Sequence, residues 1–440
     1  MNLTLNALGW LIMLIGISIS IALHEVGHLV TAKRFGVKVT QYMVGFGPTL
    51  WSRVRGETEY GLKAIPLGGY IRMIGMFPPA KGDPENMVRA STTGRIGALV
   101  EDARQSSALE VAPEDSDRVF YKLPVRQKIV VMLGGPTMNF IIATLLFTVA
   151  LVGIGTPVAS NLVGAVAQCV PTEASIKANT PTAECTGASA PSVLAGLQAG
   201  DRIVEFGGVA TPSWTELRDQ IRATPVGPVS MVVERDSSTV NLSADLVSAP
   251  RGQFNDKDEL TGFAPGSYFG MIPQEELQRQ PVSAVPVQMW SITKAATAAI
   301  VTLPIKMWEL SQTVFGSQPR DPNGLVGVVG VGRISGEVVA AEGIEVQLKV
   351  LQIVGLLAGL NLFLFLFNLI PLLPLDGGHV VGALWEGIKR RWARMTNRPD
   401  PGPVDVAKAL PLAYGISIVL VVMGALLVWA DLFEPITLGL

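Results

Sequence analysis

Four long apolar runs dominate the pattern of hydrophobic and polar positions along the chain. As a helix, each run is long enough to cross the roughly 30 Å hydrocarbon core of a bilayer, which takes about 20 residues. The runs cover Leu5–Ala32, Ile129–Ile154, Val350–Leu373 and Ala409–Leu432. The pattern therefore predicts an α-helical polytopic membrane protein with about four transmembrane helices.

The composition agrees with a membrane protein that has a polar middle. Hydrophobic residues occupy 49% of the 440 positions and charged residues only 16%, whereas about a quarter of the residues in soluble proteins are charged. The formal net charge of −2 gives no reason to expect nucleic acid as a partner. The lipid bilayer is the partner that this composition predicts.

Basic residues lie at one end of each of the first three runs. They are Lys33, Arg34 and Lys38 after the first run, Lys122, Arg126 and Lys128 before the second, and Lys389, Arg390, Arg391, Arg394 and Arg398 after the third. Because Lys and Arg accumulate in cytoplasmic loops, we expect both termini outside the cytoplasm and the segment between the second and third spans outside as well. The lack of Lys and Arg before Lys33 predicts a retained first span instead of a cleaved signal peptide.

Short strands separated by glycine and proline follow the first span. They are expected at Val37–Val44, Tyr60–Ile65 and Tyr70–Ile74. Such a β-hairpin can dip into the membrane where protein or a water-filled cavity covers its backbone. A plain cytoplasmic hairpin is the alternative. Residues 78–118 are polar and predict an insertion without a packed core.

The segment from 160 to 250 predicts a β-rich extracytoplasmic module. We expect strands at Leu162–Ala167, Val229–Arg235 and Thr239–Leu246, and a short amphipathic helix at Trp214–Ala223. The run from Ala195 to Gly208 resembles the signature of PDZ domains, which capture peptide ends or strands along a sheet edge. A β-sandwich of unrelated type is the alternative, and it leaves the glycine spacing of this run unexplained.

The two cysteines of the chain, Cys169 and Cys185, flank an insertion near the start of this module. Zinc is not expected there, because no further Cys or His lies nearby to complete a tetrahedral set. If the segment faces an oxidising compartment, a disulfide between them is expected. Two free thiols are the alternative.

The expected organisation has eight parts. Residues 251–349 contain amphipathic stretches at Val287–Val301 and Met307–Val314 and a glycine-rich run from Gly324 to Gly336, which lacks the pattern of a phosphate-binding loop. The expected parts are 1–35 (first span), 36–128 (hairpin and insertion), 129–155 (second span), 160–250 (PDZ-like module), 251–349 (peripheral helices), 350–379 (third span), 380–408 (basic cytoplasmic loop) and 409–432 (fourth span).

Three titratable residues interrupt the first apolar run in the order His24-Glu25-Val26-Gly27-His28. Titratable groups are costly in hydrocarbon, so the cluster predicts a functional site. Positions four apart share one face of a helix, so His24 and His28 can point two imidazoles at one metal ion. Glu25 lies where metal-activated water needs a proton acceptor. A polar patch satisfied by neighbouring helices is the simpler alternative, but with three histidines in the chain this spacing rarely arises by chance.

A catalytic zinc takes three protein ligands, and the end of the third span offers the missing one. Asp376 follows Pro371 and Pro374, which interrupt the helix and leave irregular backbone at membrane depth. In the expected topology, Asp376 and His28 both lie near the cytoplasmic side. An Asp-Gly turn at the surface is the alternative for Asp376. His379, three residues further on, is expected to donate a hydrogen bond around the site instead of binding the metal.

Together these motifs resemble the paired signature of the site-2 protease family of intramembrane zinc metallopeptidases. The matching residues are His24-Glu-x-x-His28 and Asn368-x-x-Pro371-x-x-Pro-Leu375-Asp376-Gly377, with Gly45-Phe-Gly-Pro48, Pro66-Leu-Gly-Gly-Tyr70 and Gly134-Gly-Pro-x-x-Asn139. The PDZ-like module resembles the bacterial branch that includes the regulator-of-sigma-E protease. Residues 78–118 and the insertion between the cysteines depart from the simplest members.

The resemblance implies a zinc metalloendopeptidase of regulated intramembrane proteolysis in the bacterial inner membrane. His24, His28 and Asp376 would bind Zn²⁺, and Glu25 would act as general base and then general acid. Asn368 and Asn139 would hold or orient substrate. The hairpin around Gly68 and Gly69 would offer an edge strand to an unwound substrate. The implied substrates are single-span membrane proteins such as anti-sigma factors already trimmed outside the membrane.

Two other classes of function fit part of the pattern. In a membrane metal transporter, His24, Glu25, His28 and Asp376 would form a transport site, and the Glu25→Gln variant would retain transport. A catalytically silent scaffold would use only the PDZ-like module for binding. The intact Glu25 argues against the scaffold.

Overall fold

The computed structural model describes residues 3–79, 100, 104, 107, 109–177, 187–255, 260–316, 318–322 and 324–436. The chain divides into two compact units. The membrane unit comprises Met1–Gly153 and Gln280–Leu440, and the β unit comprises Ile154–Arg279. The polar insertion predicted at 78–118 lies largely outside the described residues, and so does Cys185.

Four helices within the described residues are long and apolar enough to cross a membrane, as predicted. They are α1 (Leu3–Arg34), α3 (Val125–Thr148) with its π-helical continuation Val149–Ile154, α9 (Val346–Asn368) and α11 (Leu410–Phe433). The 32 residues of α1 give about 48 Å of helix, more than the hydrocarbon core requires. Lys33 and Arg34 end α1 and favour its C-terminal dipole.

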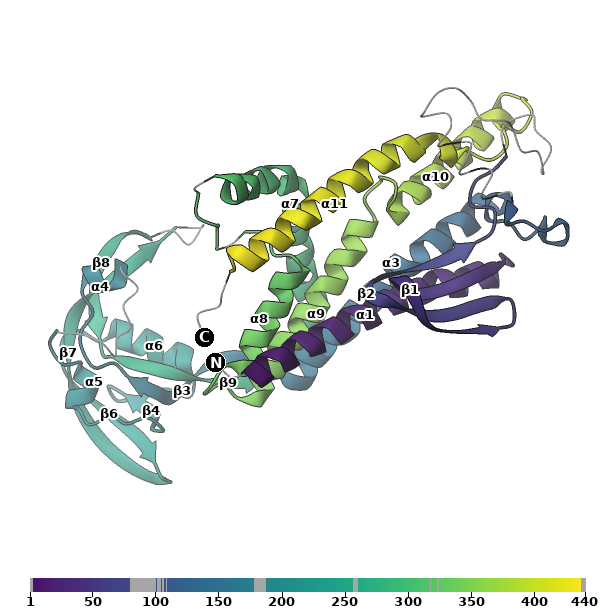
Figure 1. Ribbon diagram of the computed structural model, residues 1–440. Helices are drawn as coiled ribbons and strands as arrows, with labels where there is room; N and C mark the ends of the chain where they lie inside the picture. Colours follow the sequence, from purple (N-terminus) through teal and green to yellow (C-terminus); the bar gives the residue numbers. More distant parts are fainter. Residues whose placement is uncertain are drawn as a thin grey trace. The chain divides into compact units, whose positions relative to one another are not determined.

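Helices α1, α3 and α9 lie against one another in the membrane unit (Figure 1). The α1 and α3 backbones come into direct contact, because a Cβ on Gly27 would lie 2.1 Å from Gly134 O. About two turns before Gly27 on α1, the buried Asn361 of α9 donates to Ser20 Oγ at 2.9 Å. These contacts hold the histidine-bearing part of α1 against α3 and the middle of α1 against α9.

The third span ends earlier than predicted, and the expected basic loop is largely helical. Helix α9 stops at Asn368 because Pro371 and Pro374 disfavour helical backbone before them. A new helix, α10 (Asp376–Met395), begins at Asp376, whose carboxylate suits the positive end of the helix dipole. Most of residues 380–408, predicted as a basic cytoplasmic loop between the third and fourth spans, therefore belong to α10, which is not one of the four candidate spans among the described residues.

The hairpin consists of β1 (Val39–Arg55) and β2 (Thr58–Met73), which are longer than the predicted strands. Gly45 and Gly47 have φ of +92° and +85° and allow β1 to bend. Val44 pairs with both Gly69 and Leu62, so the first half of β1 lies between the two halves of β2. Among the described residues, no further strand pairs with the 69–73 half of β2.

Two further helices of the membrane unit come directly before α9 in the sequence. Helix α7 (Ala284–Phe315) joins the two predicted amphipathic stretches into one helix that contains Pro304. The glycine-rich run forms much of α8 (Val328–Ala340), because its glycines allow close packing against α1: a Cβ on Gly332 would lie 2.3 Å from the Trp10 ring. Asp431 at the end of α11 caps α8 by accepting the N–H groups of Gly327 and Gly330 at 2.9 and 2.8 Å.

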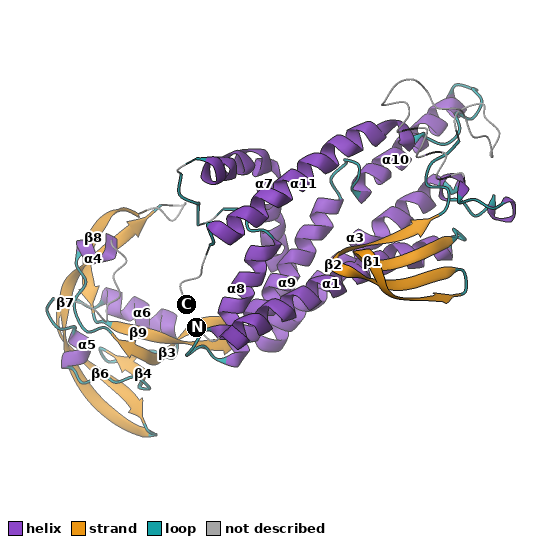
Figure 2. Cartoon of the chain, viewed as in Figure 1, coloured by secondary structure: helices purple, strands orange, loops and turns teal. Residues whose placement is uncertain are grey.

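The β unit contains a sheet in the order β8-β7-β6-β4-β3-β9 (Figure 2). A short strand, β5, pairs with β4. Its described elements are β3 (Thr156–Val166), α4 (Glu173–Lys177), α5 (Pro191–Leu194), β4 (Arg202–Phe206), β5 (Val209–Ala210), α6 (Trp214–Ala223), β6 (Gly227–Arg235), β7 (Ser238–Phe254), β8 (Leu260–Tyr268) and β9 (Met271–Gln278). The predicted helix Trp214–Ala223 is confirmed as α6. The sheet continues past residue 250, because pairing of β9 with β3 and of β8 with β7 outweighs the weak strand propensity of their Gly, Pro and Glu residues.

The run from Ala195 to Gly208 contains the turns before β4, β4 itself and the tight turn between β4 and β5. Gly196, Gly200, Gly207 and Gly208 all have positive φ, which explains the glycine spacing. Burial of the Asp201 carboxyl acts to raise its pKa, but hydrogen bonds from Arg235 and the Gln198 N–H hold the pKa below its ordinary value. Phe206 and Phe269 pack edge to face in the core below this connection, with ring centroids 5.5 Å apart.

A buried ion pair attaches α10 to α3. Lys128 Nζ lies 2.8 Å from Glu386 Oε2, and the two side chains are only 6% and 3% exposed. Glu386 also pairs with Arg390 at 2.9 Å. Because Asp376 is the first residue of α10, this ion pair helps to set where Asp376 lies relative to α3.

We expect Glu386→Ala to destabilise the protein by about 3–5 kcal/mol, since it leaves the Lys128 charge buried without its partner. Thermal unfolding of the detergent-purified protein measures this as a lower midpoint. The double variant Lys128→Met/Glu386→Leu removes both charges and should recover most of the loss. The exposed Glu342→Ala is the control. A midpoint for Glu386→Ala equal to that of the control would show that the ion pair does not stabilise the packing of α10 on α3.

Candidate metal centre

Three ligand atoms from distant parts of the chain meet between α1, α3 and α10. His24 Nε2 and His28 Nε2 are 3.3 Å apart, and each lies 3.4 Å from Asp376 Oδ2. The three residues form a group of side chains that can hold a metal ion. The structure therefore brings together the three residues that the sequence predicts as ligands.

The donor set fits zinc. Zinc bonds to His nitrogen and carboxylate oxygen are about 2.0–2.2 Å long, so ligand atoms at the corners of a tetrahedron lie about 3.3–3.6 Å apart. The observed separations of 3.3 and 3.4 Å agree with this geometry. Asp376 Oδ2 is buried and makes no hydrogen bond among the described residues, as expected of an atom placed to bind a metal.

Helix α3 passes directly under this group. A Cβ on Gly135 would lie 2.3 Å from His28 Nε2 and 2.5 Å from His24 Nε2. The same helix contacts both histidines at their other ring nitrogen: Val131 O lies 2.8 Å from His28 Nδ1, and the Asn139 amide lies 3.1 Å from His24 Nδ1. Sequence reasoning missed Val131 and Gly135, although the glycine and proline run at 134–136 was a signal that α3 approaches another backbone.

Glu25 lies between the ligand group and the hairpin. The backbone N–H of Ile71 in β2 donates to its carboxylate. A Cβ on Gly69 would lie 3.1 Å from Glu25 Cγ, so β2 runs close beside this residue. Glu25 thus neighbours both the histidines and the outer edge of β2.

Two hydrogen bonds hold the hairpin against α1. Ser18 Oγ shares its one proton between Leu14 O of α1 at 2.7 Å and Pro66 O at 3.2 Å, and Tyr42 Oη donates to Ala22 O at 2.8 Å. Burial, with the nearby Glu25 charge, raises the pKa of Tyr42 to about 12, so its hydroxyl keeps the proton that it donates. The depth of the hairpin alongside α1 is therefore fixed close to the ligand group.

Asn368, Gly68 and His379, which the sequence also predicts at or near the site, are not part of the ligand group. Asn368 is the last residue of α9 and donates to Leu364 O in its own helix at 3.1 Å. Gly68 has φ of +128° and faces the Phe46 ring. His379 lies one turn beyond Asp376 on α10 and is outside the ligand group. The predicted substrate roles of Asn368 and Gly68 stay predictions.

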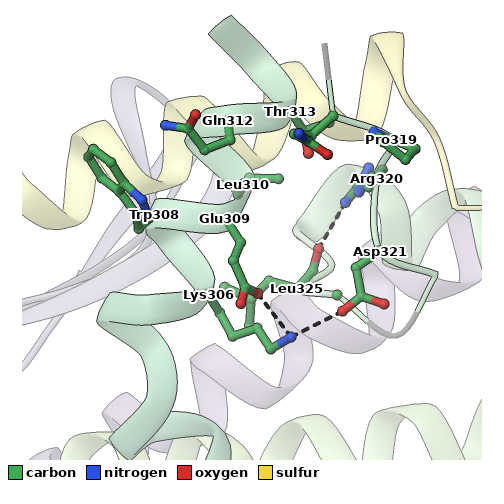
Figure 3. A pocket seen from close by; sticks show the side chains of 12 residues that line it. Lys306, Trp308, Glu309, Leu310, Gln312, Thr313, Pro319, Arg320, Asp321 and Leu325 are labelled. Carbon is green, nitrogen blue, oxygen red and sulfur yellow. Dashed lines mark hydrogen bonds and ion pairs between the residues drawn. The ribbon is translucent and has the colours of Figure 1, made fainter. Parts of the chain in front are cut away.

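A hollow of about 540 Å³ lies at the C-terminal end of α7, away from the ligand group. Lys306 forms ion pairs there with Glu309 and Asp321, both at 3.0 Å (Figure 3). Arg320 donates to Leu325 O at 2.8 Å and to Asp431 at 2.7 Å. These bonds tie the end of α7 to the segment that enters α8, so we assign the hollow a structural role.

Comparison with known proteins identifies the family to which the chain belongs. Residues 12–398 match Peptidase family M50, and the chain belongs to this family. The zinc metalloprotease Rip1 of Mycobacterium tuberculosis is 34% identical over 441 residues, which cover 98% of each chain. The metalloprotease MmpA of Caulobacter vibrioides is 28% identical over 405 residues, covering 87% of this chain and 89% of MmpA.

The family and the fold together define a multi-pass membrane protein that is a zinc metalloendopeptidase. The resemblance to site-2 proteases and the expected Zn²⁺ cofactor are thereby confirmed. These relatives favour a peptidase over a metal transporter or a silent scaffold.

We expect Asp376→Asn to lose most of its zinc, because a neutral amide is a poor zinc ligand and the group supplies only three ligands. Metal analysis of the purified protein should find about one zinc per chain in wild type and far less in this variant. The exposed Asp400→Asn is the matched control and should keep its zinc. A full complement of zinc in Asp376→Asn would exclude Asp376 as a ligand.

Proposed function

We propose that this protein is an intramembrane protease that hydrolyses a peptide bond in or near the transmembrane segment of single-span membrane proteins. One observation carries the proposal: the group formed by His24, His28 and Asp376 is built on the membrane helix α1 and the start of α10, with Glu25 between it and a β-strand. A water-using centre at this position acts on substrates that a soluble peptidase does not reach.

In the proposed mechanism, His24, His28 and Asp376 bind zinc and Glu25 transfers the protons. When bound, zinc supplies a Lewis acid that polarises a carbonyl and makes water acidic enough to react near neutral pH. Glu25 accepts the proton of the attacking water and then gives it to the amide nitrogen that leaves. The Ile71 N–H that donates to its carboxylate orients Glu25 for both steps.

The outer edge of β2 is proposed to bind the substrate as an added strand. A helix hides its peptide bonds in internal hydrogen bonds, so the substrate must unwind before cleavage. Within the described part of the chain, residues 69–73 of β2 pair with β1 on one side only, and their other side faces Glu25. An unwound segment that pairs there would pass beside the ligand group in extended form.

An apolar cavity of about 550 Å³ supports this path. It is lined by α1 from Trp10 to Ile17, by Ala64–Pro66 of the hairpin and by part of α8. The hairpin residues that line it lead directly into the 69–73 edge. The part of a substrate that remains helical would find apolar walls here before the chain reaches Glu25.

The proposed orientation places both termini and the β unit outside the cytoplasm of a bacterial inner membrane. Lys389, Arg390, Arg391 and Arg394 of α10, with Lys33 and Arg34 of α1, would then face the cytoplasm. The β unit would act as a PDZ-like domain that binds a new substrate C-terminus or excludes untrimmed substrates. The expected substrates are anti-sigma factors or similar regulators already trimmed outside.

We expect Glu25→Gln to lower cleavage of a single-span model substrate by about 10²–10⁴-fold, since glutamine cannot accept the proton. Gel analysis of products from detergent-purified protein, with and without a zinc chelator, measures this. Zinc content should stay at the wild-type level, because Glu25 is not in the ligand group. Equal cleavage by wild type and Glu25→Gln would disprove the proposed mechanism.

A side chain at Gly69 should block substrate without removing zinc. A Cβ there would already lie 3.1 Å from Glu25 Cγ and 3.2 Å from Ile21 Cγ2, so Gly69→Val crowds the space between β2 and α1 beside Glu25. We expect cleavage to fall by roughly 10–100-fold, because small misplacements of a substrate cost about this much. Gly424→Val, whose side chain would enter open space on α11, is the control. Unchanged cleavage by Gly69→Val would argue against strand addition at this edge.

A further inference from the structure

Two groups on α3, a backbone carbonyl and a side-chain amide, face the outer ring nitrogens of the site histidines. Val131 O lies 2.8 Å from His28 Nδ1, and the Asn139 amide group lies 3.1 Å from His24 Nδ1. The two α3 residues are separated by about 12 Å, slightly more than two helical turns, and Gly135 lies between them under both Nε2 atoms. One helix therefore contacts the Nδ1 atoms of both imidazoles and also runs close to their Nε2 atoms.

For His28 the contact determines the tautomer. A backbone carbonyl only accepts hydrogen bonds, so His28 Nδ1 must carry the proton that it shares with Val131 O. The lone pair then lies on Nε2, which faces Asp376 Oδ2. This is the tautomer that a metal ligand needs, and a side-chain substitution at Val131 does not remove the acceptor.

For His24 the contact depends on how the Asn139 amide is turned. With Asn139 Nδ2 toward His24, the amide donates a hydrogen bond to His24 Nδ1. His24 Nδ1 then holds the lone pair, and His24 Nε2 holds the proton. That tautomer does not bind a metal through Nε2. It also leaves Asn139 Oδ1 buried and without a hydrogen-bond donor among the described residues, although Asn139 is only 1% exposed. A buried unsatisfied amide oxygen is costly.

Turning the amide by 180° removes the conflict with metal binding. The Oδ1 atom then accepts the Nδ1–H of His24, and the lone pair moves to Nε2, which faces Asp376. We propose, on the basis of the zinc site above, that Asn139 is a positioning residue whose Oδ1 holds His24 in its metal-binding tautomer. Asn139 thus acts on the ligand and not on the substrate.

The test is the zinc affinity of the full chain in detergent, measured by competition with a chromogenic chelator. Asn139→Leu removes the acceptor at similar volume and should weaken zinc binding by about 10–100-fold, the usual effect of losing such a partner. Asn139→Asp restores an acceptor and should bind zinc about as tightly as wild type. The control is Asn361→Ala, since Asn361 is equally buried but donates to Ser20 instead of contacting a histidine; its zinc affinity should not change.

Two results would overturn the inference. If Asn139→Leu binds zinc like wild type but no longer cleaves, Asn139 contacts substrate. If Asn139→Leu and Asn139→Asp lower the zinc affinity equally, the packing of the Asn139 side chain, and not its acceptance of a hydrogen bond, determines the affinity. Should Asn139→Leu fail to fold, Asn139→Ala against Asn139→Asp gives the same comparison. A wild-type protein that binds no zinc would contradict the proposed zinc site itself, which separates that failure from a failure of the Asn139 inference.

Discussion

The direct backbone contact between α1 and α3 is the constraint on which the rest of the site depends. A Cβ on Gly27 would lie 2.1 Å from Gly134 O, and one on Gly134 would lie 2.4 Å from Gly27 O. Only glycine on both helices permits this approach. It brings Gly135 under the two imidazoles and Val131 and Asn139 within reach of their outer nitrogens.

The other parts of the membrane unit position groups around this crossing. The irregular backbone after Pro371 delivers Asp376 at the start of α10, and the Lys128–Glu386 pair attaches that helix to α3. On the opposite side, Tyr42 and Ser18 hold the hairpin against α1, so that β2 runs beside Glu25. Ligands and base are thus supported by three segments that are far apart in the sequence, which is how a site remains ordered among helices whose outer faces contact lipid.

The sequence predicted the four spans and the grouping of His24, His28 and Asp376, because both follow from strong rules: apolar length and the cost of titratable groups in hydrocarbon. It missed features set by tertiary contacts. Strands β8 and β9 contain Gly, Pro and Glu residues and are held by pairing, and α8 forms through a glycine run because α1 packs against it. The role of Val131 also escaped, since a backbone carbonyl leaves no signature in a sequence, and the glycines at 134 and 135 indicate a close approach without showing which group approaches.

The central claim is that a zinc ion is held by two imidazoles and one carboxylate between α1, α3 and α10. X-ray absorption at the zinc edge of the detergent-purified protein tests it most directly. The account predicts a four-coordinate ion with nitrogen and oxygen ligands at about 2.0–2.2 Å and the multiple scattering of two imidazoles. Sulfur ligands at about 2.3 Å, or a spectrum without imidazole scattering, would contradict it.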